Sequence, residues 1–267
     1  MMASSSVESM PPPKPSLYSA FRGMWTLTWR SKLTWRRILQ VLSSMLSLPI
    51  FATIIFESGQ TEGFTRLLIQ VYLFLALPVL CVSHFGSMIR DELQDDTMTF
   101  LITRPLSRAR LYVTKYATLM LWVQIVLFGN ALAFWIAGMI LRIDGIHALM
   151  FQVIQVQFLG IFAFGALSSL MGLATQKYLI AAVVYGLIVE VGIGQIPTNI
   201  NVLSISRHLK TLLAHNPELS RLYGWTTDGS SFSLAMIAAG SVLFIGLGAA
   251  LFHFREYHHT DEVRKSS

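Results

Sequence analysis

Six long apolar runs constrain the fold of this chain more than any other feature of its sequence. They cover residues 39–56, 67–89, 111–141, 147–175, 178–197 and 232–254. Each is about long enough to cross a hydrocarbon layer of about 30 Å as a helix, which takes about 20 residues. Hydrophobic residues make up 54% of the chain and charged residues only 13%, which is too apolar for an ordinary soluble domain. The runs therefore predict an all-α integral membrane protein with six transmembrane helices.

The Lys and Arg residues predict the orientation of these helices. Basic residues concentrate in short cytoplasmic segments, and an even number of spans places both ends of the chain on one side of the membrane. With both termini in the cytoplasm, fifteen of the 20 basic residues lie in inner segments. The five outer ones are Arg66, Arg142, Arg207, Lys210 and Arg221. We therefore expect a multi-pass protein in contact with membrane lipid, with both termini cytoplasmic.

Several other classes of function find no support in the sequence. The net charge of +6 is spread between the apolar runs and forms no basic stripe, so it does not indicate binding of nucleic acid. Cys81 is the single cysteine and lies inside an apolar run, which supports neither a disulfide nor a cysteine-ligated metal. Three C-terminal histidines lack a fourth metal ligand: His253, His258 and His259. Ser and His residues show no ordered catalytic arrangement. We expect no catalytic residue and no metal site.

The N-terminal segment has two parts of different character. Residues 1–16, MMASSSVESMPPPKPS, are rich in Ser and Pro without an apolar core, so we expect a disordered tail rather than a signal peptide. In the next part an apolar stripe recurs every fourth residue beside basic residues, at Phe21, Trp25, Trp29 and Leu33. This pattern favours an elbow helix in the inner membrane interface, and it also suits a cytoplasmic helix packed on a partner protein.

The predicted membrane domain covers residues 17–255, and a cytoplasmic C-terminal tail follows at residues 256–267. The largest outer connection of the membrane domain is residues 198–231. Apolar residues recur there at helical spacing, at Val202, Ile205, Leu209, Leu212 and Leu213. We expect a second interfacial helix, which rests on the outer leaflet or caps the bundle.

The most polar internal stretch is DELQDDTMTFLITRPLSR, residues 91–108, on the predicted cytoplasmic side between the second and third runs. In a helix, its acidic and apolar residues fall on opposite faces, the polar one with Glu92, Asp95, Asp96 and Thr99 and the apolar one with Leu93, Thr97, Phe100 and Leu101. Pro105 disfavours helix at Arg104, and Ser107 can cap a second helix that begins there. Such an acidic face suits a protein partner better than anionic lipid.

The residues of this stretch carry a family resemblance. The order Glu92, Thr97, Pro105, Ser107, Arg108, Lys115 resembles that of ABC-type exporter permeases of the second type. In those proteins a Glu, a Gly-Thr pair, an apolar run, a Pro-x-Ser-Arg turn and a Lys follow one another between spans two and three. The six spans, the elbow helix and the outer segment also fit, so the resemblance covers residues 17 to 255. The chain departs from the pattern at Asp96, where the family usually has Gly.

The resemblance implies that residues 91–110 form a coupling segment, whose helix docks on a cytoplasmic ABC ATPase subunit. The coupling residues would be Glu92, Asp95, Asp96, Thr97, Phe100, Arg104, Pro105, Ser107 and Arg108. The sequence has no G-x-x-x-x-G-K-[ST] motif, so ATP and Mg would bind to the partner chain and this chain would hold no cofactor. The resemblance also implies a second permease copy, identical or a close paralogue.

Polar residues inside the predicted spans are candidates for a substrate path or gate. They are Glu190, Asn130, Gln124 and Gln155. An ionisable residue within a span is a functional candidate by default, but Glu190 lies near Gly192, Gly194 and Pro197, where the helix is expected to end. It could instead reach water or pair with Arg207 or His208. Bonds between helices explain the three amides equally well.

The sequence therefore predicts the permease subunit of a bacterial ABC exporter in the cytoplasmic membrane, driven by a separate ATPase. An alternative is a membrane anchor or mechanical transmitter, which uses the ATPase to act on a periplasmic or other envelope protein without moving a solute.

Overall fold

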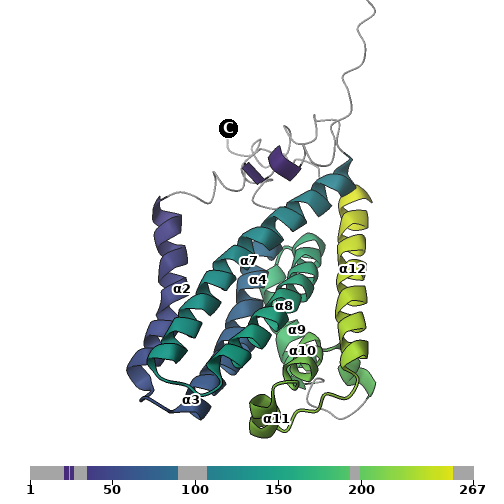
Figure 1. Cartoon of the computed structure of the whole chain (residues 1–267). Helices are drawn as coiled ribbons and strands as arrows, with labels where there is room; N and C mark the ends of the chain where they lie inside the picture. The colour runs from purple at the N-terminus through teal and green to yellow at the C-terminus, as the bar shows by residue number, and fades with distance from the viewer. Residues whose placement is uncertain (1–20, 24, 27–34, 90–106, 193–198, 255–267) are drawn as a thin grey trace, which may run out of the picture.

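The computed structural model describes residues 21–23, 25–26, 35–89, 107–192 and 199–254, and every regular element in these ranges is a helix. The long helices form a bundle (Figure 1). The N-terminal half contains α2 (Trp35–Ile55), α3 (Thr61–Arg66), the π-helix η1 (Leu67–Ala76), α4 (Leu77–Gly86) and α7 (Arg108–Ile140). The C-terminal half contains α8 (Ile146–Ala174), α9 (Tyr178–Tyr185), the π-helix η2 (Gly186–Gly192), the 3-10 helix η4 (Asn199–Leu203), α10 (Ile205–Leu213), α11 (Pro217–Tyr223) and α12 (Ser230–Phe254).

Four helices in the described part of the chain are long and apolar enough to cross a membrane: Thr61–Gly86, Arg108–Ile140, Ile146–Ala174 and Ser230–Phe254. They correspond to the second, third, fourth and sixth predicted spans. Shorter apolar helices at Leu46–Ile55 and Tyr178–Gly192 correspond to the first and fifth. The prediction of an all-α membrane protein is confirmed, and the count of six spans stays a prediction.

The second span begins earlier than its apolar run. Helix starts at Thr61 rather than at residue 67, and it continues without a break through η1 into α4. The added turn is polar, so hydropathy did not include it. Glu62 and Arg66 form an ion pair of 2.6 Å there, one helical turn apart, which supports an exposed helix start.

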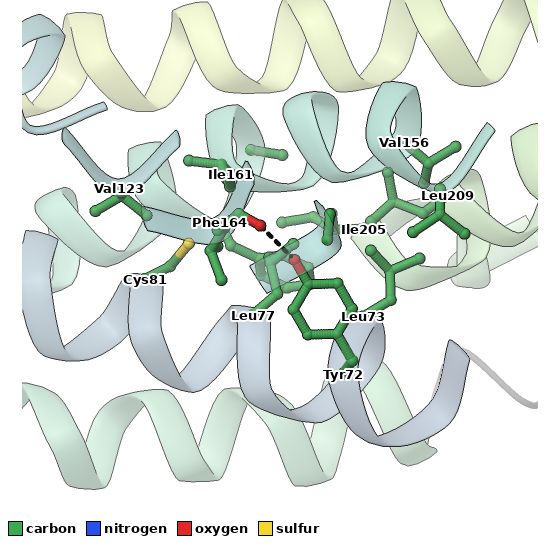
Figure 2. Packing of buried hydrophobic residues seen from close by; sticks show 14 of the residues in the cluster. Tyr72, Leu73, Leu77, Cys81, Val123, Val156, Ile161, Phe164, Ile205 and Leu209 are labelled. Atoms are coloured by element: carbon green, nitrogen blue, oxygen red, sulfur yellow. Dashed lines mark hydrogen bonds between the residues drawn. The ribbon is translucent and has the colours of Figure 1, made fainter. Parts of the chain in front are cut away.

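The core lies where span two meets α7, α8 and α10. Figure 2 shows Tyr72, Leu77 and Cys81 of span two among side chains of those helices, including Val123, Ile161 and Leu209. Cys81 is completely buried, so the single thiol of the chain is a packing group. Helix α8 packs against α4, α7, α10 and α12, which makes it the central helix of the bundle.

The helices define two ends of the bundle (Figure 1). Helices α2 and α7 begin, and α12 ends, at one end, while α3, α10 and α11 lie at the other. We call these the inner and the outer end, following the topology predicted from the basic residues.

The outer segment contains the predicted second helix. Ile205, Leu209 and Leu213 of α10 are buried, and α10 packs on α8 and α12. Of the two expected arrangements, the structure therefore shows a helix that caps the bundle. We call α10 the outer cap.

Several predicted features lie wholly or partly outside the described residues. Of the elbow helix, residues 21–23 and 25–26 are helical, and the rings of Phe21 and Trp25 stack with centroids 6.5 Å apart. The coupling residues from Glu92 to Pro105 and both predicted tails are outside the described ranges.

Candidate functional site

The carboxylate of Glu190 lies at the N-terminus of the outer cap. Its Oε1 accepts hydrogen bonds from the Ile205 amide at 3.0 Å and the Tyr185 hydroxyl at 2.8 Å. Its Oε2 accepts from the Ser206 amide at 2.9 Å and the Ser204 hydroxyl at 2.7 Å. Four donors therefore converge on two carboxylate oxygens.

This position suits a negative charge. The first amides of a helix have no partner within the helix, and the helix dipole makes this end positive. Ser204 is the N-cap of α10 and accepts from the Arg207 amide at 3.2 Å, so Glu190 and Ser204 together satisfy three successive amides. The hydrogen-bond partners of the carboxylate are thus not the side chains of Arg207 or His208, which the sequence offered as candidates. Arg207 bonds the Asn201 side chain instead.

The C-terminus of the outer cap is held by a different helix. Gln152 of α8 donates from Nε2 to the carbonyl oxygens of Leu212 at 2.8 Å and Leu213 at 3.1 Å. The last carbonyls of a helix lack partners within it. Here they accept from the His215 and Asn216 amides after the helix, and Gln152 adds a donor from another helix. Both ends of the outer cap therefore bond to side chains from predicted membrane spans.

His208 links the middle of the outer cap to α12. Its Nε2 lies 2.8 Å from the carbonyl oxygen of Val202, and its Nδ1 lies 3.1 Å from the Ser233 hydroxyl. A carbonyl only accepts, so Nε2 carries the proton and, in the neutral ring, Nδ1 accepts from Ser233. Burial lowers the pKa of His208 and Arg207 adds to this, while the Val202 carbonyl and Glu190 oppose it.

An aromatic and basic cluster lies beside the outer cap. The Lys210 ammonium is 5.5 Å from the centre of the Phe74 ring, which meets Trp225 edge to face. Trp225 in turn stacks on Tyr223 with ring centroids 4.3 Å apart. Burial lowers the pKa of Lys210, and the negative charge of Glu190 opposes that shift. Aromatic rings and basic groups of this kind are typical of a membrane interface.

A second polar group is buried in the middle of the bundle. The Tyr72 hydroxyl is 2.9 Å from the Leu127 carbonyl oxygen and 2.6 Å from Gln157 Oε1. A phenol has one proton, so it can donate to only one of these two oxygens. If the oxygen and nitrogen of the Gln157 amide exchange places, Nε2 donates to the Tyr72 hydroxyl and this hydroxyl donates to the Leu127 carbonyl. Both short contacts are then hydrogen bonds with one donor and one acceptor.

The four candidate path residues do not form one site. Asn130 of α7 is buried, and its Oδ1 has no hydrogen-bond partner among the described residues; the same holds for Gln124 Oε1. Gln155 of α8 is exposed. In the described part of the chain, no hydrogen bond joins these amides to each other or to Glu190.

The contacts bring Glu190 together with Tyr185 and Ser204, which sequence reasoning missed. A Ser directly before a helical pattern is a cap signal that would have indicated Ser204.

At the inner end, Ser107 caps α7 as predicted. Its hydroxyl accepts from the Arg110 amide at 3.4 Å, and α7 begins at Arg108.

A family model described as ABC-2 family transporter protein matches residues 30–194, which is more than half of the chain. The chain belongs to the ABC-2 transporter family.

The match extends from the predicted elbow to the predicted fifth span of this ABC-2 permease, so it includes the residues of the predicted coupling segment. A search of curated proteins found no match. The family confirms the resemblance noted in the sequence, and with the apolar helices it shows a multi-pass membrane protein of the transport class. The permease of this family is a non-catalytic subunit.

Proposed function

We propose that this ABC-2 permease is the membrane subunit of a bacterial exporter in the cytoplasmic membrane, with both termini inside. Two permease chains, identical or paralogous, would enclose a path, and two separate ATPase chains would bind ATP and Mg. The observation that carries this proposal is the family match across residues 30–194, which includes the residues of the predicted coupling segment.

The work of this chain is then conformational. ATP binding brings the ATPase subunits together, and the docked coupling segments move with them. The spans respond by exchanging inward for outward access. Glu92, Asp95 and Asp96 would face the ATPase, and the turn at Arg104, Pro105 and Ser107 would connect the segment to α7.

Charge reversal at the coupling segment tests this proposal. Glu92→Lys with Asp95→Lys should reduce copurification of the proposed ATPase partner, or uncouple its activity, while the permease still inserts. Asp228→Lys is the matched control, because Asp228 is exposed and lies just before α12, which begins at the outer end. Wild-type assembly and coupled turnover in the double variant would place the docking surface elsewhere.

A mechanical transmitter is the second candidate, and the outer cap favours it. Bonds from Glu190, Gln152 and His208 fix α10 to three other elements, so a movement of those elements would reach the outer surface. A crosslinker at Asp228 should then capture an envelope protein in an ATP-dependent manner. Transport of a solute by the reconstituted permease and ATPase alone would exclude this candidate.

A further inference from the structure

Both flanks of the coupling segment meet the same turn of α8. Helix α4 ends at Gly86, before the segment, and α7 begins at Arg108, within the last residues of the segment, and continues beyond it. Gly86 lies against Gly172, and the hydroxyl of Tyr112 in the second turn of α7 lies 2.8 Å from Ser169 Oγ. Ser169 and Gly172 are three residues apart, which places them on one helical turn. This junction turn, Ser169 to Gly172, is therefore touched from both flanks.

The contact on the α4 side is one of backbone against backbone. A methyl group on Gly172 would overlap the carbonyl oxygen of Gly86, and no side-chain rotation can relieve that overlap. A methyl group on Gly86 would overlap the ring of Tyr178, the first residue of α9. Gly86 is thus enclosed between the end of α8 and the start of α9, without space for independent movement.

The contact on the α7 side is a buried hydrogen bond. Ser169 Oγ also lies 2.8 Å from the carbonyl oxygen of Ala166, which only accepts. Ser169 therefore donates to Ala166, and Tyr112 donates to Ser169. A methyl group on Gly248 of α12 would overlap the Tyr112 hydroxyl, so this hydroxyl is packed between α8 and α12.

A continuous set of contacts leads from this turn to the outer end. Helix α9 begins at Tyr178, against Gly86, and its last turn continues into η2 through Gly186 in the right-handed helical conformation. Glu190 of η2 then accepts hydrogen bonds from the first amides of the outer cap. One helical element therefore touches the flank of the coupling segment at one end and the outer cap at the other.

We propose that the junction turn, Ser169 to Gly172, is where movement of the coupling segment enters the bundle, and that α9 and Glu190 pass this movement to the outer cap. Ser169 and Gly172 are positioning residues in this scheme, since they transmit motion and contact no substrate. The inference rests on the proposed function, because it requires an ATPase that moves the coupling segment.

An environment-sensitive fluorophore on the outer cap tests this inference. His215 lies just after α10 and is exposed, so His215→Cys provides the attachment site for the fluorophore. The native Cys81 is buried and should not be labelled. The labelled permease is reconstituted in nanodiscs with its ATPase, and fluorescence is compared before and after Mg-ATP with vanadate. Wild-type permease should respond. Gly172→Ala and Tyr112→Phe should each lose at least half of the response, while the ATPase copurifies at the wild-type level.

Two control variants separate this turn from general damage. Gly240→Ala adds the same methyl group in α12, where it meets nothing within 4 Å. Tyr116→Phe removes another hydroxyl that bonds α7 to α8, since Tyr116 donates to the Phe162 carbonyl at 2.8 Å. Both controls should keep the full response. An equal loss in Tyr116→Phe would overturn the assignment to the junction turn.

The outcomes also separate this inference from the proposed function. A wild-type permease that neither copurifies with the ATPase nor responds to nucleotide overturns both. A wild-type response that persists in both test variants overturns only the inference. If Gly172→Ala does not fold, Tyr112→Phe decides the question, because it removes a single oxygen atom and adds no volume.

Discussion

The carboxylate of Glu190 and the backbone amide of Ser206 are 2.9 Å apart, although 16 residues separate them in the chain. This bond and the parallel one to Ile205 join the predicted fifth span to the outer cap. They also account for a charged residue near the end of an apolar run, because the charge lies at the positive end of a helix. The structural role of Glu190 can now be tested by substitution.

Glu190→Gln should destabilise the permease by about 1.5–3 kcal/mol, the usual value of hydrogen bonds to a charged group. All four partners of the carboxylate are donors here, and a Gln amide offers only one oxygen, so its NH₂ group would face donors. Glu190→Leu should cost more, since it leaves all four donors without this acceptor. Thermal unfolding in detergent measures both changes. Wild-type stability together with lost transport in Glu190→Gln would instead indicate a transport role.

Gln152→Met should lower the free energy of unfolding by about 0.5–1.5 kcal/mol, because the two carbonyls at the end of α10 each lose one of their donors while the side-chain volume is kept. Gln155→Met is the matched control, one turn along α8 and exposed, and should change stability little. Since Gln152 and Glu190 hold the same short helix, the double variant should lose less than the sum of the two single losses. Additive losses would show that the two ends of α10 are independent.

His208 should make stability depend on pH below about 6.5. Burial lowers the pKa of the folded-state ring below its ordinary value of 6.5, so the unfolded chain binds more protons as the pH falls. The contribution is fully present above pH 6.5 and is lost toward the folded-state pKa. His208→Gln can still donate to Val202 and accept from Ser233, and should show a flatter profile. The melting temperature between pH 5 and pH 8, compared for the two proteins, measures the difference; identical profiles would contradict the prediction.

Gly248→Ala and Gly240→Ala should have opposite effects, although both lie in α12. The first methyl group overlaps the Tyr112 hydroxyl, so it should destabilise, whereas the second meets open space and should stabilise by up to about 1 kcal/mol through helix propensity. Tyr112→Phe should partly rescue Gly248→Ala, since it removes the nearest atom. Denaturation of the two single variants and the double variant in one detergent checks this. Equal effects at the two glycines would contradict the close contact.

Cysteine labelling should separate the two sides of the membrane. Cysteines at Ser4 and Ser267 should be protected from an impermeant reagent added to intact cells, and one at Asp228 should react. Cys81 is buried and should give little background. Asp228 is preferable to the adjacent Gly229, whose φ of +76° strains any other residue. Reaction at either terminus would refute the predicted topology.

Sequence reasoning located four of the predicted spans because hydropathy responds to long apolar runs, and it located the Ser107 cap because that signal is local. It failed where partners are distant. The donors of Glu190 include two backbone amides, and the acceptors of Gln152 are carbonyls 60 and 61 residues away, which no side-chain pattern marks. It also did not predict the π-helices η1 and η2, since an apolar run is compatible with either helical geometry. The coupling residues from Glu92 to Pro105 stay predictions.

The hydrogen bonds that hold the outer cap also imply an order of assembly during synthesis. Gln152 and Glu190 precede α10 in the chain, so both of its ends can be satisfied as soon as it leaves the ribosome. Ser233 follows it, and until α12 is inserted His208 lacks this partner. A chain truncated before Ser230 would therefore expose a half-bonded histidine and the apolar face that α12 covers. Insertion of the final helix is thus the step that completes the outer surface.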